Sequence, residues 1–265
     1  MKKRIIASIL TVIMLMTMLQ TAALAADGEG TEAVASTTPQ AAIYLDQQHG
    51  ADSNDGLTKE SAVQSIVKAN ELAESNHTND IYLTSFYKIT GAEVWDLGGK
   101  TIHRYGLGGY MIELVNASAS LTLSNVVIDG AEYTVEATHA AETDSIIKAA
   151  NGGTIVLKSG AVLQNNKAAQ FGSSILANNG VNITMEDGAI IRNNTNRNYE
   201  LGGGILIGNG STFTMNGGEI SGNTANGGGG VAIIGSTMVM NDGTISNNST
   251  YRTSGQGSYG AGVYV

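Results

Sequence analysis

The sequence predicts an all-β fold: a parallel β-helix solenoid with three short strands per coil and an N-terminal capping helix. The first observation is a repeat in which an alternating strand leads to a glycine (Gly160, Gly188, Gly218 or Gly243), with an asparagine five residues further on. The intervals of 28, 30 and 25 residues between these glycines suit one solenoid coil per repeat. The second is composition, because 35 glycines with three phenylalanines and one tryptophan fit a thin aliphatic core.

Residues 1–25 have the layout of a secretory signal peptide. Three basic residues at 2–4 precede an apolar run over 5–19, and Ala-Leu-Ala at 23–25 supplies the small residues of a cleavage site. The alternative is a membrane anchor, but the run is shorter than the roughly 20 residues that span a bilayer. We therefore expect a secreted or cell-surface protein. The absence of cysteine from an exported chain favours a bacterial surface.

The acidic charge of the chain argues against two classes of partner. The formal net charge of −9 becomes −12 when the three cations at 2–4 leave with the signal peptide. Nucleic acids and anionic membranes attract basic surfaces, so we expect neither as a partner. We also expect no cofactor and no metal. The four histidines lack ligand spacing, and Asp-Ser-Asn-Asp-Gly at 52–56 lacks the spacing of a calcium loop.

The chain before the repeats divides into a leader and a cap. Residues 26–40 are acidic and small without apolar periodicity, which is typical of a disordered segment. Residues 41–109 are expected to form the N-terminal cap and the first coils. A helix is expected over 58–73, because apolar residues recur there at helical spacing and Thr58 or Ser61 can cap it. Short strands are expected at 43–46, 81–83, 94–97 and 100–102.

Residues 110–265 carry the β-helix repeats. Along the second strand of each coil apolar residues alternate, as Ile155 and Leu157 do, so that one side faces the core. The repeat asparagines are expected at one coil corner, where asparagine tolerates the left-handed conformation and can hydrogen-bond along the axis. The entry strands of the coils are expected at 146–147, 175–176, 205–207 and 231–233, and the ladder at Asn165, Asn193, Asn223 and Asn248.

These repeats resemble those of a known family. Val162-x-x-Asn165 and its three equivalents, paired with Gly202-Gly203-Gly204-Ile205 and Gly228-Gly229-Gly230-Val231, are similar to repeats of pectate-lyase-like right-handed parallel β-helix surface proteins. Both chlamydial polymorphic outer-membrane proteins and adhesin-like proteins of Gram-positive anaerobes carry such repeats. The turn at 52–56 and the helix after it look like the N-terminal cap of that fold. The resemblance covers about residues 43–265 and implies right-handed coils and a surface passenger, but it does not fix an activity.

The loops that follow the asparagine corner are the expected binding surface, because insertions at one corner of a solenoid share a face. Three of these loops pair a cation with an aromatic ring. We expect a non-catalytic, adhesin-like passenger that contacts a polysaccharide or a cell-surface glycan. The expected contact residues are Lys167, Phe171, Arg197, Tyr199, Tyr251, Arg252 and Tyr259.

The alternative function is that of a polysaccharide lyase or a glycoside hydrolase on the same fold. A hydrolase needs a pair of carboxylates, and a lyase needs a base near a bound uronate. The sequence assigns no catalytic residue. Two polar clusters are the places where one would be sought: Lys100, His103 and Arg104, and then Asp129, Glu142, Asp144 and Lys148.

The C-terminal segment 259–265 matches an entry strand such as 228–233 and stops before a second and third strand. The solenoid is therefore expected to be truncated at this point. An open last coil presents unpaired N–H and C=O groups to other chains. We expect the 265-residue chain to self-associate through this coil by β-augmentation.

Overall fold

The computed structural model describes residues 42–132, 144–169, 172, 174–196, 201–251 and 259–265. The expected signal peptide and acidic leader lie outside these residues. So do Glu142 and four expected contact residues: Phe171, Arg197, Tyr199 and Arg252. Pro39–Val265 forms one compact unit.

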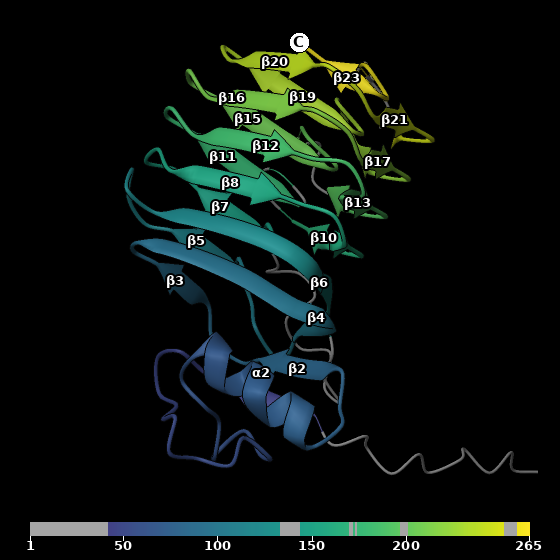
Figure 1. Cartoon of the computed structure of the whole chain (residues 1–265). Helices are drawn as coiled ribbons and strands as arrows, with labels where there is room; N and C mark the ends of the chain where they lie inside the picture. Colours follow the sequence, from purple (N-terminus) through teal and green to yellow (C-terminus); the bar gives the residue numbers. More distant parts are fainter. Residues whose placement is uncertain (1–41, 133–143, 170–171, 173, 197–200, 252–258) are drawn as a thin grey trace, which may run out of the picture. The chain divides into compact units, whose positions relative to one another are not determined.

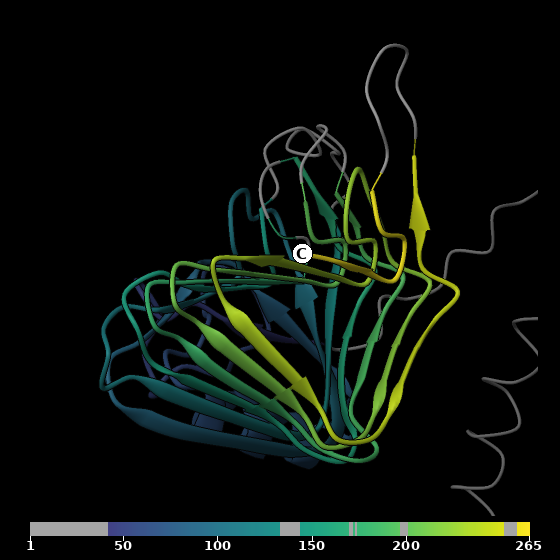
Figure 2. The same ribbon diagram turned by 90° about the horizontal axis from the view of Figure 1, so that it is seen from above.

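The described part of this unit is a parallel β-solenoid, which confirms the predicted fold class (Figure 1). Strands that follow one another in the chain lie on different sides of the coil, and each pairs in parallel with a strand one coil later. Figure 2 shows the coils lying over one another when viewed from the C-terminal coil. The right-handed winding that the resemblance implies stays a prediction.

Three sheets run along the solenoid. The first has seven strands: β3 (Tyr87–Ile89), β5 (Ile112–Leu114), β7 (Ile147–Ala149), β11 (Ile175–Asn178), β15 (Ile205–Gly208), β19 (Val231–Ile234) and β23 (Val263–Tyr264). The second has twelve strands and divides into two branches after its first four, which are β1 (Ile43–Leu45), β2 (Asp80–Leu83), β4 (Ala92–Arg104) and β6 (Ser120–Glu132). One branch contains β8 (Thr154–Leu157), β12 (Asn182–Met185), β16 (Thr212–Met215) and β20 (Thr237–Met240). The other contains β9 (Ala161–Gln164), β13 (Ile190–Arg192), β17 (Glu219–Ser221) and β21 (Thr244–Ser246).

The third sheet adds a fourth strand to the later coils, where three strands per coil were expected. It contains four strands of two residues: β10 (Lys167–Ala168), β14 (Thr195–Asn196), β18 (Thr224–Ala225) and β22 (Ser249–Thr250). They lie just after the asparagine corner, in segments that the sequence predicts to be loops. Two residues are too few for apolar alternation to mark a strand.

Two long strands, β4 and β6, unite the branches of the twelve-stranded sheet. β6 pairs with β8 through Ser120–Leu123 and with β9 through Val126–Asp129. The strands expected at 94–97 and 100–102 are accordingly two halves of β4, separated by an irregularity between Asp96 and Lys100. Each long strand bends round a corner that later coils make with a turn.

The core is one continuous apolar cluster inside the coils. Every side chain of the predicted alternation is buried in three successive coils: Ile155 and Leu157, Ile183 and Met185, Phe213 and Met215. Their parallel partners stack on one another along the axis, as Ile183 does between Ile155 and Phe213. Most members of this cluster are aliphatic, which agrees with the small number of aromatic residues in the sequence.

A column of four asparagines lies at the corner, at Asn166, Asn194, Asn223 and Asn248. The backbone N–H of each donates to the Oδ1 atom of the next, at 3.0 Å in all three steps. The first three side chains are fully buried. The side-chain amides also donate to carbonyls of the coil before, for example from Asn223 to Ile191 at 3.0 Å. These bonds satisfy polar groups that would otherwise be orphaned in the core.

The predicted ladder members Asn165 and Asn193 stand one residue before this column. They adopt left-handed φ angles of 60° and 57°, as expected for a corner, but do not form the ladder. The difference arises because the turns have unequal lengths. Four residues separate Met185 from Ile190, whereas three separate Met215 from Glu219, their strand partners. The residue five positions after the repeat glycine is therefore the left-handed corner residue in two coils, Asn165 and Asn193. In the other two coils it is the ladder residue, Asn223 and Asn248.

Arg104 begins the ladder at its N-terminal end. Its side chain is fully buried, and its Nη2 atom donates to Asn166 Oδ1 at 3.2 Å. The guanidinium also donates to the carbonyls of Leu107 and Gly109 at 3.0 and 2.6 Å. One coil lies between Arg104 and Asn166, and there Gly130 occupies the corner. A Cβ atom on Gly130 would lie 2.5 Å from atoms of Asn166, so only glycine fits.

The helix is shorter than predicted: α2 spans Ile66–Ser75, with Ser65 as its N-cap. Thr58 and Ser61 instead hydrogen-bond to each other in a turn. Residue Val63 lies beside β1, where its N–H donates to Tyr44 O at 3.0 Å. The apolar residues expected on one helix face thus belong partly to an extended segment that covers the edge of the first strand.

Substitutions at the corner should separate the two asparagine columns. Asn194→Ala leaves the N–H of Asn166 and the carbonyl of Leu163 without their partners, so we expect it to lower the free energy of unfolding by about 2–3 kcal/mol. Asn193→Gly preserves the left-handed corner and should change it by less than about 0.5 kcal/mol. Urea unfolding measures both. Equal losses for the two variants would contradict this assignment of the ladder.

Candidate functional site

Three of the seven expected contact residues lie in the described part of the chain. Lys167 is exposed on β10. The hydroxyl of Tyr251 donates to Asn196 O at 2.6 Å, so this ring also supports the corner of a coil two turns earlier. Tyr259 is 53% exposed and forms a bridge with Gly227. Lys167 and Tyr251 lie at opposite ends of the four-stranded corner sheet, on β10 and directly after β22. Phe171 and Arg252, the ring and the cation expected beside them, lie outside the described residues.

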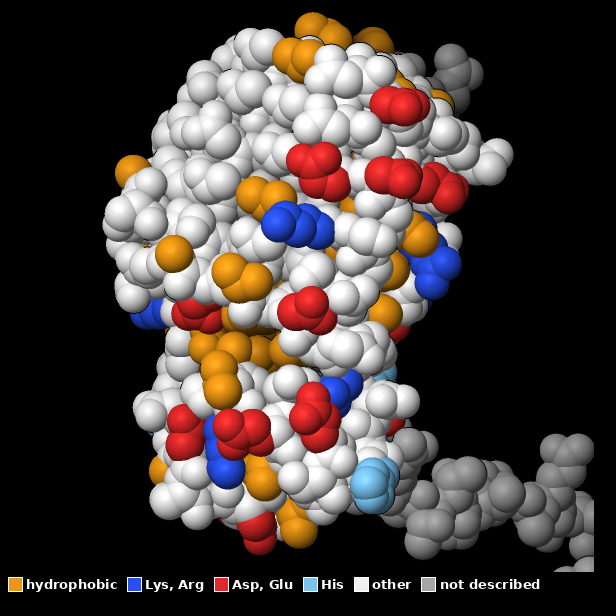
Figure 3. All heavy atoms as spheres, viewed as in Figure 1, with side chains coloured by type: hydrophobic (Ala, Val, Ile, Leu, Met, Phe, Trp, Pro, Cys, Tyr) orange, Lys and Arg blue, Asp and Glu red, His pale blue; other side chains and the backbone are white. Residues whose placement is uncertain are grey.

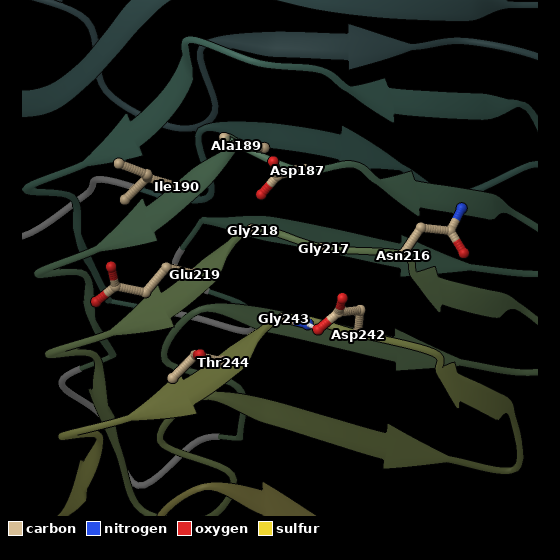
Figure 4. Close-up of a pocket in the computed structure, with 11 residues that line it drawn as sticks. Asp187, Ala189, Ile190, Asn216, Gly217, Gly218, Glu219, Asp242, Gly243 and Thr244 are labelled. Atoms are coloured by element: carbon tan, nitrogen blue, oxygen red, sulfur yellow. Dashed lines mark hydrogen bonds between the residues drawn. The ribbon is translucent and has the colours of Figure 1, made fainter.

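A shallow groove crosses three successive turns between the two branches of the large sheet (Figure 4). Its acidic residues are Asp187, Glu219 and Asp242. The Oδ1 atom of Asp242 accepts the N–H of Gly243 at 2.7 Å, which is the turn-forming role expected for aspartate. Beside the groove, the amide of Asn241 donates to Asn216 at 2.8 Å. Asp242 and Asn216 of the groove are thus engaged in bonds within and between the turns.

The cations of the two expected polar clusters hold the fold together. Lys100 is buried and its Nζ atom lies 3.3 Å from Glu74 and 3.2 Å from Leu97 O. Arg104 donates to Asn166, the first asparagine of the ladder. Within the described ranges, no group of three or more His, Cys, Asp or Glu side chains is placed to hold a metal ion.

Lys148 belongs to a compact cluster on the seven-stranded sheet. Its Nζ atom lies 3.4 Å from Glu113 Oε1 and 4.6 Å from the centre of the Tyr110 ring. The hydroxyl of Tyr110 donates to Glu113 Oε2 at 2.9 Å. Burial, together with the bonded Glu113 carboxylate, raises the pKa of Tyr110 to about 12. These groups satisfy one another and cover the outer side of the strands.

A cluster of aromatic rings lies on the outer side of the first coils; we call it the tyrosine cluster and define it as Tyr44, Tyr82, Tyr105 and His103. Tyr82 stacks on Tyr105, with ring centres 5.0 Å apart and planes 15° apart. Tyr44 meets both of these rings edge-on at 5.4 Å. The ring of His103 meets Tyr82 at 5.6 Å. All four side chains are partly exposed.

Strand register brings these rings together. Tyr44 of β1 pairs with Tyr82 of β2, which pairs with His103 of β4, and Tyr105 follows directly after β4. Each lies at a position that alternates with a buried core residue, so its side chain points out of the coil. Parallel pairing therefore brings one ring from β1, one from β2 and two from β4 and the residue after it to the same side of the coil.

A carboxylate lies beside the rings. Asp80 Oδ1 is 2.7 Å from His103 Nε2, and both side chains are partly exposed, at 30% and 20%. The same outward column continues into the next coils through Asp129, Gln164 and Arg192. There Gln164 donates to Asp129 at 2.9 Å and Arg192 donates to Gln164 at 2.8 Å. The outer side of this branch thus joins ring faces to polar groups that can donate and accept hydrogen bonds.

The sequence analysis did not identify the tyrosine cluster, and it placed His103 in a polar cluster with Lys100 and Arg104. A signal was present: Ile43-Tyr44-Leu45 and Ile81-Tyr82-Leu83 share one pattern, and Ile102-His103-Arg104 repeats its apolar-aromatic start. The intervals between these segments are unequal, so the pattern becomes evident only once the strands are in register.

Comparisons with known proteins identify no relative. No family model, no curated protein and no solved structure matches the chain. No helix in the ranges that the structure describes is both long and apolar enough to cross a membrane.

Alkaline pH should destabilise the solenoid through two tyrosines. Burial, with a smaller contribution from Glu93, raises the pKa of Tyr87 to about 12, the same value as Tyr110. Both rings ionise near pH 10 when the chain is unfolded. The folded state therefore loses stability as the pH rises from about 10 towards 12, and below 10 these two groups leave it unchanged. Urea unfolding over this pH range measures the loss, and Tyr110→Phe should reduce it. A constant free energy of unfolding up to pH 12 would contradict the expectation.

Proposed function

We propose that this chain is a secreted or cell-surface β-helix passenger, adhesin-like and non-catalytic, that contacts glycans. The observation that carries the proposal is the tyrosine cluster with Asp80 at its side. The resemblance of the repeats to pectate-lyase-like surface proteins adds support, as does the export signal expected at residues 1–25.

The chemistry of the tyrosine cluster suits a sugar. The faces of a pyranose ring carry C–H groups, which pack on aromatic rings, while its edges carry hydroxyl groups. Tyr44, Tyr82 and Tyr105 provide ring surface at 5.0–5.4 Å from one another. Asp80 and His103 provide hydrogen-bonding groups beside it. Apolar surface with a few convergent polar groups is the usual composition of a small-ligand site.

The corner residues of the sequence prediction stay part of the proposal as a second contact region. Lys167, Tyr251 and Tyr259 follow the asparagine corner of their coils, with Phe171, Arg197, Tyr199 and Arg252 in the intervening segments. A glycan of several residues would then meet rings at two places on the solenoid.

Binding to immobilised linear and branched oligosaccharides tests the function. The chain without residues 1–25 should bind at least one glycan class. Tyr82→Ala should weaken that binding between about twofold and tenfold, because an aromatic contact contributes roughly 0.5–1.5 kcal/mol. Tyr110→Ala is the matched control, since it removes a ring from the other side of the coil, and it should bind as the parent does.

Two results would count against the proposal. One is the absence of binding to every glycan class in the panel. The other is release of reducing or unsaturated sugar ends during the incubation, which would favour a polysaccharide lyase or glycoside hydrolase. Circular dichroism of both variants shows whether a loss of binding reflects the site or the fold.

A further inference from the structure

The first half of strand β4 has an open edge. On one side β6 pairs with it along Ala92–Asp96, whereas β2, on the other side, pairs only with Thr101–Arg104. In a parallel sheet, successive residues of a strand direct their N–H and C=O groups to opposite neighbours. The N–H of Ser120 donates to Gly91 O at 2.9 Å, so the odd-numbered residues of this half face β6 and the even-numbered ones face the open side.

The backbone groups on the open side are available for pairing. Within the described ranges, the backbone N–H and C=O groups of Ala92, Val94 and Asp96 form no hydrogen bond. A Cβ atom on Gly91 or Gly99 would meet no atom within 4 Å, and the side chain of Val94 is 71% exposed. Figure 3 shows hydrophobic side chains in a recess at the level where Figure 1 places β4 and α2. An unpaired strand edge of this kind is a template for an added strand.

The N-terminal cap covers another edge but leaves this one free. On β3, the terminal strand of the seven-stranded sheet, the side chain of Gln47 takes the place of a neighbouring strand. Its Oε1 atom accepts the N–H of Lys88 at 2.7 Å, and its Nε2 atom donates to Lys88 O at 2.9 Å. No such side chain replaces a strand beside Ala92–Asp96 in the described residues.

The surroundings of the open edge are acidic. Helix α2 and residues 92–99 together hold four acidic residues and one lysine: Glu71, Glu74, Glu93, Asp96 and Lys68. Hydrogen bonds from the amide of Asn125 and from the N–H of Gly98 lower the pKa of Asp96, which favours its ionised form. A partner with basic side chains complements this charge.

We propose that the open edge of β4 binds an extended, basic peptide segment of another protein, which adds to the sheet as a strand. Pairing with the backbone supplies affinity, and side chains at alternate positions supply selectivity. Val94 and Asp96 point out of the coil, because Trp95 and Leu97 are buried in the core. The partner therefore needs an apolar side chain beside Val94 and a basic one, two residues away, beside Asp96.

Two other occupants fit the edge less well. A second copy of this chain would bring Glu93 and Asp96 of both copies together, and like charges on paired strands are destabilising. Residues 26–40 of the chain itself hold three acidic residues and no Lys or Arg, so the acidic edge repels them as well. A basic segment from a different protein meets neither obstacle.

Fluorescence anisotropy with three labelled peptides tests the proposal. The first peptide alternates valine and lysine on one face and carries threonine on the other. The second has glutamate in place of lysine, and the third is the first with every backbone nitrogen methylated. We expect the chain without residues 1–25 to bind the first peptide at least about tenfold more tightly than either of the others, because they lack the matching charge or the strand donors.

Two variants locate the binding. Val94→Pro removes a donor on the open side without breaking a bond to β6, and Asp96→Lys reverses a charge. Each should weaken binding of the lysine peptide at least about fivefold. Glu186→Lys is the matched control and should bind as the parent does. Glu186 also accepts from an asparagine, Asn216 at 3.3 Å, but it follows β12, both of whose edges are paired.

Hydrogen exchange of the complex provides a second measurement, since the amides of Val94 and Asp96 should exchange more slowly when the peptide is bound. Failure to bind the lysine peptide would overturn the proposal, and so would equal binding of either control peptide. A dimer of the chain alone that Val94→Pro dissociates would also overturn it, because the occupant would then be a second copy. Circular dichroism of each variant shows whether a loss of binding reflects the edge or the fold.

Discussion

The hydrogen bond from a backbone N–H to the side-chain oxygen of an asparagine one coil later holds the corner of this solenoid in register. A parallel strand can shift along its neighbour by two residues and keep its apolar side inwards. The chain of bonds through Asn166, Asn194 and Asn223 prevents that shift, because the side-chain oxygen of Asn194 accepts from Asn166 and that of Asn223 accepts from Asn194. Turn lengths vary between coils, yet the strands that leave each corner stay aligned. The flat stacking of Ile155, Ile183 and Phe213 in the core depends on this alignment.

The fold was predictable because its signal repeats. Alternation such as Ile155 with Leu157 recurs in every coil, and a recurring pattern of that length fits few architectures other than a solenoid. The position of the ladder was not predictable to the residue, because the turn before β17 is one residue shorter than the turn before β13. The start of the helix was also misplaced. Hydrophobic spacing at 62–67 suits a helix, but Val63 pairs with β1, and tertiary pairing overrides a local pattern of that length.

The candidate site depends even more on tertiary pairing that the sequence pattern does not reveal. Tyr44 and Tyr82 come together only because β1 pairs with β2, and the sequence between them holds a turn region and a helix of its own. Two cations that the sequence analysis placed in polar clusters have structural roles instead. Arg104 is buried and donates to Asn166 of the ladder, and Lys148 is paired with Glu113. A cation near carboxylates in sequence does not distinguish a reactive group from a structural one, since only the three-dimensional partners decide between them.

The absence of a Cβ atom at Gly130 limits where coils can be added to this solenoid or removed from it. Arg104 reaches across one coil to Asn166, and this reach requires one glycine corner in between. A coil inserted or deleted there would break the span. Beyond Asn166 every step of the ladder is the same, from asparagine to asparagine, so whole coils can be duplicated or lost in that region without altering the steps that remain. The number of coils after Asn166 can therefore change by duplication, whereas the number of coils between Arg104 and Asn166 cannot.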